Sequence, residues 1–182
     1  MKCLVFSDSH NNSFFMKRAI SMHPDAEVVF FLGDGLSDID DIYTSFPNMK
    51  FLAVRGNCDH SGIALGAMIP KTESITLEGK RITYTHGDLY GVKYSSDGIE
   101  QLAKKTSSDI ILFGHTHTPF LKYIPGQDFS DDEIIKKYES GISPDKPFYL
   151  FNPGSIGSSY TPSYGVITLG KGEPLLSHGN FL

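Results

Sequence analysis

Short apolar runs recur along the chain, and each one ends abruptly in a polar cluster. They are rich in Val, Ile and Phe and only a few residues long, which is typical of buried strands rather than helices. Strands are therefore predicted over residues 3–6, 28–32, 51–54, 82–85 and 110–113.

Other stretches repeat apolar residues at helical spacing. This spacing predicts helices over residues 13–21, 38–46 and 97–106, and Asn12 or Ser13 is expected to cap the first of them. Strands and helices alternate in the early part of the chain. This alternation predicts a parallel core sheet, since parallel strands need a crossover connection that is usually helical.

The remaining apolar segments have the pattern of antiparallel strands. Residues 73–77 and 81–85 flank Glu78-Gly79-Lys80, a sequence that predicts a hairpin turn. Gly170-Lys171-Gly172 predicts a second turn. Further strands are predicted over residues 120–124, 147–151, 164–169 and 174–177. The fold class is therefore α/β with mixed sheets.

A chain of 182 residues fits a single domain, 1–182, and is long enough to bury a substantial core. The polar segment 125–145 interrupts the strand pattern. We interpret it as a surface excursion between two strands, with a lid or a subunit contact as the alternatives.

Composition and charge exclude several classes of protein. Two cysteines, Cys3 and Cys58, are too few for a disulfide scaffold. The net charge of -5 is too acidic for a protein whose main role is to grip a nucleic-acid backbone. No apolar stretch approaches a signal-peptide core or the ~20 residues of a membrane helix, so a cytoplasmic protein is expected.

Side chains that commonly bind metals follow the predicted strands at their carboxyl ends. In open α/β sheets these ends border the crevice where ligands bind. Alternate residues in an extended chain point the same way, so Asp-x-His and His-x-His can each converge on one centre. The candidate ligands are Asp8, His10, Asp34, Asn57, His86, His115 and His117.

A bound metal explains this clustering better than a structural role does. Carboxylates and imidazoles gathered without a counter-ion are costly, and a cation removes that cost. Imidazole, carboxylate and amide ligands suit Mn, Fe, Co, Ni or Zn rather than an all-oxygen calcium site. The set is too large for one octahedral ion with an open position. It fits two ions that share a bridging carboxylate, as in two-metal hydrolases.

The order of the motifs resembles the calcineurin-like metallophosphoesterases, and especially their small single-domain prokaryotic phosphodiesterase branch. The motifs are Asp-x-His, Gly-Asp, Gly-Asn-x-Asp, His-Gly and Gly-His-Thr-His within residues 8–117, and Asn152-Pro153-Gly154-Ser155 resembles a further signature. The resemblance implies a four-layer α/β/β/α sandwich of two mixed β-sheets. It also implies a binuclear metal-dependent phosphoesterase in which a metal-bridging hydroxide attacks phosphorus in line.

The resemblance divides the candidate ligands between two metals. The first takes Asp8, His10 and His117, the second takes Asn57, His86 and His115, and Asp34 bridges both. Asp34 and Asn57 are thereby also catalytic candidates. The expected cofactors are two divalent ions, with Mn as the first expectation and Fe, Ni, Zn, Co or Mg as alternatives.

The sequence departs from the family at Cys58, where many members have a histidine that can donate a proton to the leaving oxygen. A thiol is a poor substitute for imidazole at neutral pH, which favours diesters over monoesters. Asp59 is a candidate to orient a neighbouring ligand. Arg55 and Asn11 are candidates to contact the substrate, with a structural ion pair and a helix start, respectively, as alternatives.

The expected function is hydrolysis of a small phosphodiester or nucleotide-like substrate. One alternative is a phosphomonoesterase or nucleotide hydrolase that uses the same centre. Another is a non-catalytic scaffold similar to the retromer subunit that shares this fold. Neither a membrane nor long nucleic acid is an expected partner. A homo-oligomer is compatible with the sequence. No residue pattern identifies the physiological substrate.

Overall fold

The computed structural model describes residues 1–126 and 146–181 and contains two five-stranded sheets. The first sheet has the order β12-β11-β1-β2-β3. Its strands are β1 (Lys2–Phe6), β2 (Val28–Phe31), β3 (Lys50–Ala53), β11 (Ser163–Thr168) and β12 (Leu175–Asn180). The second has the order β6-β7-β8-β10-β9. Its strands are β6 (Thr72–Leu77), β7 (Lys80–Thr85), β8 (Ile110–Leu112), β9 (Pro119–Ile124) and β10 (Phe148–Pro153).

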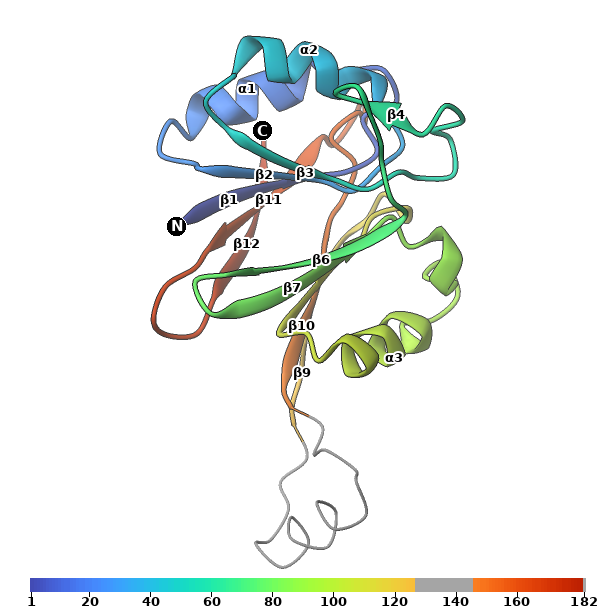
Figure 1. Ribbon diagram of the computed structural model, residues 1–182, viewed down its shortest axis with the longest axis vertical. Helices are drawn as coiled ribbons and strands as arrows, with labels where there is room; N and C mark the ends of the chain where they lie inside the picture. The colour runs from blue at the N-terminus through green and yellow to red at the C-terminus, as the bar shows by residue number, and fades with distance from the viewer. Residues whose placement is uncertain (127–145, 182) are drawn as a thin grey trace, which may run out of the picture.

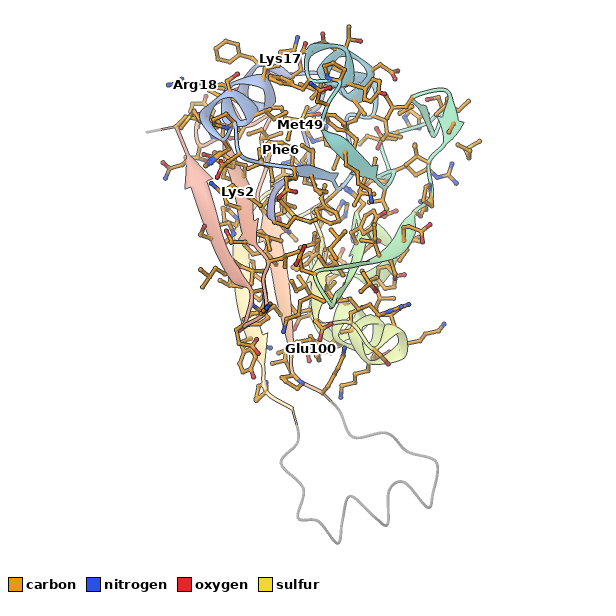
Figure 2. All side chains as sticks on the ribbon, turned by 60° about the vertical axis from the view of Figure 1, so that its left-hand side comes forward. Lys2, Phe6, Lys17, Arg18, Met49 and Glu100 are labelled. Carbon is orange, nitrogen blue, oxygen red and sulfur yellow. The ribbon has the colours of Figure 1, made fainter. Side chains whose placement is uncertain are left out.

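Helices cover the outer face of each sheet, so the molecule has four layers (Figure 1). α1 (Phe14–Met22) and α2 (Ser37–Ser45) lie on the first sheet, and α3 (Asp97–Thr106) lies on the second. In Figure 2, Lys17 and Arg18 on α1 lie at the opposite end of the folded body from Glu100 on α3. The expected α/β/β/α sandwich of two mixed sheets is confirmed.

The core follows the two-residue period of the strands. In β1, Leu4 and Phe6 face α1 and α2, whereas Cys3 and Val5 face the second sheet. Strands buried on both faces read as continuous apolar runs, which is why the early strands were visible in the sequence. The inner layer between the sheets includes Phe30 from β2 and Phe151 from β10.

Parallel strands bring the carboxyl ends of both sheets to one rim of the sandwich. β1, β2 and β3 are parallel neighbours in the first sheet, and β7, β8 and β10 are parallel neighbours in the second. The predicted parallel core is confirmed. The predicted hairpins are confirmed too, since β6 pairs with β7 and β11 with β12 in antiparallel register.

Several local features differ from the expectations. The two-residue strands β4 (Ile63–Ala64) and β5 (Ala67–Met68) form a small hairpin that the hydrophobic pattern did not predict. Ser13 occupies the N-cap position of α1, but its hydroxyl donates to Asp41 Oδ2 instead of capping the helix. The segment 125–145 lies outside the described residues apart from its first two positions. Among the described helices, none has the length and apolar character needed to cross a membrane.

Candidate metal centre

The strand ends of both sheets bring six of the seven predicted ligands together. The loops after β1 and β2 supply Asp8, His10 and Asp34, and the loops after β7 and β8 supply His86, His115 and His117. The six divide into two clusters that match the division expected from the family resemblance, apart from Asn57. The centre therefore spans the junction between the two sheets.

The first cluster consists of Asp8, His10 and His117. Asp8 is fully buried, and its Oδ1 lies 3.2 Å from the Nε2 of His117. The Nε2 atoms of His10 and His117 are 3.2 Å apart. Three potential ligand atoms therefore lie close together, and the two imidazole rings are partly exposed to solvent.

The second cluster consists of Asp34, His86 and His115. The Nε2 of His86 lies 3.4 Å from Asp34 Oδ2 and 3.1 Å from His115 Nδ1. The other ring nitrogen of His86, Nδ1, donates to the backbone carbonyl of Leu32 at 2.8 Å. This hydrogen bond orients the ring and leaves Nε2 as the ligand atom, an arrangement common in metal sites.

The donor set fits divalent cations. Asp8 Oδ1 is buried and has no hydrogen-bond partner among residues 1–126 and 146–181, although an unpaired buried carboxylate oxygen is costly. Within each cluster the ligand atoms lie within 4.8 Å of one another, and pairs of imidazole nitrogens face each other. A cation at each cluster would satisfy both features. Mixed imidazole and carboxylate ligands suit transition metals such as Mn, Fe or Zn.

The surroundings of Asp34 hold its carboxylate ionised. Burial acts to raise the pKa of Asp34, but hydrogen bonds from His86 and from the backbone N–H of Cys58 hold that pKa well below its usual range. Burial likewise opposes protonation of His86, yet its hydrogen bond to Asp34 and the charges of Asp8 and Asp34 raise its pKa. The chain therefore presents negative charge where the cations would lie.

The two histidines of the loop after β8 differ in their surroundings. The neighbouring Asp8 carboxylate raises the pKa of His117 despite partial burial. Burial lowers the pKa of His115, and the charges of His86 and Lys93 lower it further. His115 is thus poised as a neutral ring, the form in which imidazole binds metals.

Asp59 supports the loop that carries Asp34. Its carboxylate accepts backbone N–H bonds from Asp34 at 2.7 Å, Gly35 at 2.8 Å, Leu36 at 2.9 Å and Gly56 at 2.8 Å. One side chain therefore ties the loop after β2 to the loop after β3. This position agrees with the prediction that Asp59 orients a neighbouring ligand.

The end of β10 and the loop that follows it perform a similar task beside the centre. Asn152 Nδ2 donates to the carbonyl of Gly114 at 2.8 Å and to Thr116 Oγ1 at 3.1 Å. Ser155 Oγ donates to the carbonyl of Asp8 at 2.8 Å. These bonds hold the Asp8 loop and the His115–His117 loop together. The family resemblance had singled out this motif as a signature, but neither the resemblance nor the residue pattern had assigned it this role.

The ligand loops adopt a rare backbone conformation. Asp8, His10, Asp34, His115 and His117 all have positive φ values between 48° and 67°. Non-glycine residues seldom adopt this left-handed region, and Asp, Asn and His do so more readily than others. The close approach of the loops also requires glycine at Gly56, since a Cβ there would lie 2.1 Å from Asp34 Oδ1.

The other predicted site residues lie at the edge of the centre. Asn57 is exposed and its amide nitrogen donates to Cys58 Sγ at 3.3 Å, not to an aspartate or histidine ligand. Burial and the neighbouring Asp34 carboxylate raise the pKa of the Cys58 thiol to about 11. Asn11 Oδ1 accepts a bond from the Ser37 hydroxyl beside His10.

Arg55 packs against the β4–β5 hairpin. Its Nη1 lies 3.8 Å from Met68 Sδ in the β4–β5 hairpin. A Cβ on Gly62 would meet the same nitrogen at 2.5 Å, so the guanidinium packs closely under that hairpin. In this position Arg55 supports the hairpin and does not line the cavity formed by His10, Asp34 and Cys58.

A concave space of about 160 Å³ opens between the loops after β1, β2 and β3. Its lining includes His10, Asp34, Cys58, Asp59 and His60. The space is large enough for a phosphate group beside the ligand clusters. Cys58 and His60 both belong to its lining and lie in the loop after β3.

Comparisons with known proteins agree with this geometry. The chain is 27% identical over 173 residues to the probable metallophosphoesterase YsnB of Bacillus subtilis, a match that covers 93% of this chain and 85% of the relative. It is 36% identical over 73 residues to the phosphodiesterase YfcE of Escherichia coli, covering 38% of this chain and 36% of that protein.

The fold itself extends to proteins of different sequence. The structure of Vacuolar Protein Sorting 29 from Cryptosporidium parvum matches with a TM-score of 0.68 at 16% identity, over 99% of this chain and 97% of the other. The sequence also matches the calcineurin-like phosphoesterase superfamily domain over residues 1–172. With nearly the whole chain matched and the metal-ligand clusters in place, this protein belongs to the calcineurin-like phosphoesterase superfamily.

Proposed function

We propose that the protein is a binuclear metal-dependent phosphodiesterase that acts on small phosphate esters. One observation carries the proposal: two clusters of potential ligands lie side by side, and Asp34 of the second cluster also forms a possible ligand group with His10 of the first cluster and Cys58. A carboxylate in that position can bridge two ions, which is the arrangement of two-metal hydrolases.

Each ligand has a defined part in this proposal. Asp8, His10 and His117 would hold one cation, and His86 and His115 would hold the other, with Asp34 shared between them. Asn57 would join the second cation by turning its amide from Cys58 toward His86 and His115. When bound, the cations activate the attacking nucleophile and neutralise charge on the phosphate. The chain itself orients these ligands through Asp59, Asn152 and Ser155.

The identity of residue 58 supports a diester rather than a monoester substrate. Cys58 lines the phosphate-sized space at the position where a histidine would donate a proton to the leaving oxygen. A monoester with a poor leaving group depends on such a donor more than an activated diester does. The name of the E. coli relative YfcE as a phosphodiesterase agrees with this assignment.

Substrate preference tests the role of Cys58 directly. The protein is expected to hydrolyse bis(4-nitrophenyl) phosphate with a higher kcat/KM than 4-nitrophenyl phosphate. Cys58→His is expected to raise kcat/KM for the monoester by about tenfold or more, because an imidazole at this position restores a proton donor. Steady-state rates of nitrophenolate release measure both substrates.

Cys58→Ser is the matched control, since a hydroxyl is no better an acid than the thiol and the ratio of the two rates should stay unchanged. If the unaltered protein preferred the monoester, the diester assignment would be wrong and the phosphomonoesterase alternative, which uses the same centre, would replace it.

Metal binding has a stoichiometry that the ligand geometry predicts. Chelator-treated protein is expected to take up about two Mn²⁺ per chain by isothermal calorimetry. At 100 times the dissociation constant each site should stabilise the fold by about 2.7 kcal/mol, because the unfolded chain lacks the site. Thermal unfolding with and without Mn²⁺ measures this effect.

His10→Ala should reduce the uptake to about one ion, since His10 belongs to the first cluster. Asp25→Asn is the control, because Asp25 is an exposed carboxylate that pairs with Lys2 at the opposite end of β2. Uptake of a single ion by the unaltered protein would contradict the binuclear proposal.

A further inference from the structure

A second cavity of about 250 Å³ opens on the α3 side of the second sheet. Its apolar lining includes Val92, Ile99, Phe113 and Phe120. Ile99 and Phe113 are buried, and the Phe113 and Phe120 rings meet edge to face with centroids 6.0 Å apart. Pockets for whole drug-sized ligands occupy about 300–1,000 Å³, so this cavity fits a smaller group such as one ring.

The cavity shares a wall with the metal centre. Thr116 lines the cavity, while its chain neighbours His115 and His117 belong to the two ligand clusters. Asn152 holds this wall in place by donating to the Gly114 carbonyl and to Thr116 Oγ1. A group attached to a phosphate at the metal centre therefore needs to extend past a single loop to enter the cavity.

The rim of the cavity carries a positive charge that faces the same loop. Lys93 is exposed and lines the cavity, and its charge acts on both His115 and His117. An ammonium group beside an apolar lining complements a ligand that has an anionic end and an apolar end. A phosphate ester of an apolar alcohol has this combination.

Tyr94 completes the rim. Its side chain is 95% exposed, although large aromatic side chains gain by burial. An aromatic ring left in water at the mouth of an apolar cavity can pack against a ligand ring that enters it. The exposed ring and the buried Phe113 thus offer contacts on two sides of the same space.

We propose that this cavity binds the organic group esterified to the substrate phosphate, and that this group is a single aromatic ring or an apolar group of similar size. The inference rests on the proposed phosphoesterase function, since the metal centre has to hold the phosphate. A larger cavity of about 380 Å³ beside Phe15 and Phe181 lacks both the shared wall and a lysine in its lining.

Binding of two phosphonates to the Mn²⁺-loaded protein tests the inference without requiring hydrolysis. Phenylphosphonate and methylphosphonate carry the same anionic head and differ only in the organic group. The unaltered protein is expected to bind phenylphosphonate about tenfold more tightly, as burial of most of a ring implies. Phe120→Ala and Tyr94→Ala should each reduce this ratio to about threefold or less, measured by calorimetry.

Tyr160→Ala is the matched control, because Tyr160 is 91% exposed and lines the cavity beside Phe15 and Phe181, so the ratio should not change. Tyr94→Ala alters only a solvent-exposed side chain and keeps the test valid if Phe120→Ala fails to fold. Equal affinities for the two phosphonates, or a ratio that neither variant changes, would overturn the inference.

The outcomes separate this inference from the proposed function. Hydrolysis of phosphodiesters without a preference for the phenyl group would leave the metal centre in place and overturn the role of the cavity. A phenyl preference that depends on Phe120 and Tyr94, in a protein that hydrolyses no phosphate ester with any metal, would support the cavity as a binding site and refute the proposed function.

Discussion

Asp34→Asn is expected to lower kcat/KM for bis(4-nitrophenyl) phosphate by about 10³-fold or more. The carboxylate lies beside His86 and accepts the backbone N–H of Cys58. It belongs to one possible ligand group with His86 and His115 and to another with His10 and Cys58. A neutral amide removes the negative charge that would hold the two cations together. Loss of about 4 kcal/mol of transition-state stabilisation corresponds to this change in rate.

The measurement requires steady-state kinetics together with metal content, because the rate should fall along with binding of the shared cation. Asp25→Asn serves again as the control for a lost surface carboxylate. A variant at Asp34 with full activity would refute the proposed centre. If the protein showed no hydrolysis at all while still binding metal, the scaffold alternative would be favoured.

Asp59→Ala is expected to reduce the free energy of unfolding by about 3 kcal/mol and to weaken metal binding. The carboxylate is the acceptor for four backbone N–H groups, and three of these belong to the loop that carries Asp34. Hydrogen bonds to charged groups are worth more than neutral ones, and donors left without partners are costly. Urea unfolding and calorimetric Mn²⁺ titration measure the two effects.

Asp59→Asn provides a graded control. Its single carbonyl oxygen can accept some of these bonds, whereas its amide group would face the remaining donors, so an intermediate loss of stability is expected. If Asp59→Ala unfolded at the same urea concentration as the unaltered protein, the carboxylate would not be the support that the hydrogen bonds indicate.

The hydrophobic pattern predicted the strands that are buried on both faces and the helices that bury one apolar face. Helix α3 has the predicted bounds of residues 97–106, because Ile99, Leu102 and Ala103 recur at helical spacing and all pack on the second sheet. The β4–β5 hairpin was missed because two-residue strands carry no periodicity. Its shape depends on the left-handed glycines Gly62 and Gly66.

The candidate ligands and one supporting residue, Asp59, were predictable from their positions after the strands, but other supporting residues were not. Asp38 lies in the first turn of α2 and has the pattern of an ordinary acidic residue there, yet it is buried and accepts the Ser9 hydroxyl beside His10. Val92 and Phe120 line the same cavity beside the centre, although they lie far apart in the sequence. Long-range packing decides both features.

The left-handed backbone conformation of the ligand loops limits which residue types these positions tolerate. A residue at position 8, 34 or 115 has to tolerate a positive φ, and apart from glycine the types that do so most readily are Asp, Asn and His. These are also the types that bind cations through oxygen or imidazole nitrogen. The backbone conformation and the metal-binding chemistry therefore favour the same residue types at these positions. A related chain that binds no metal is therefore still expected to keep several of these residues, because its loops need residue types that tolerate a positive φ.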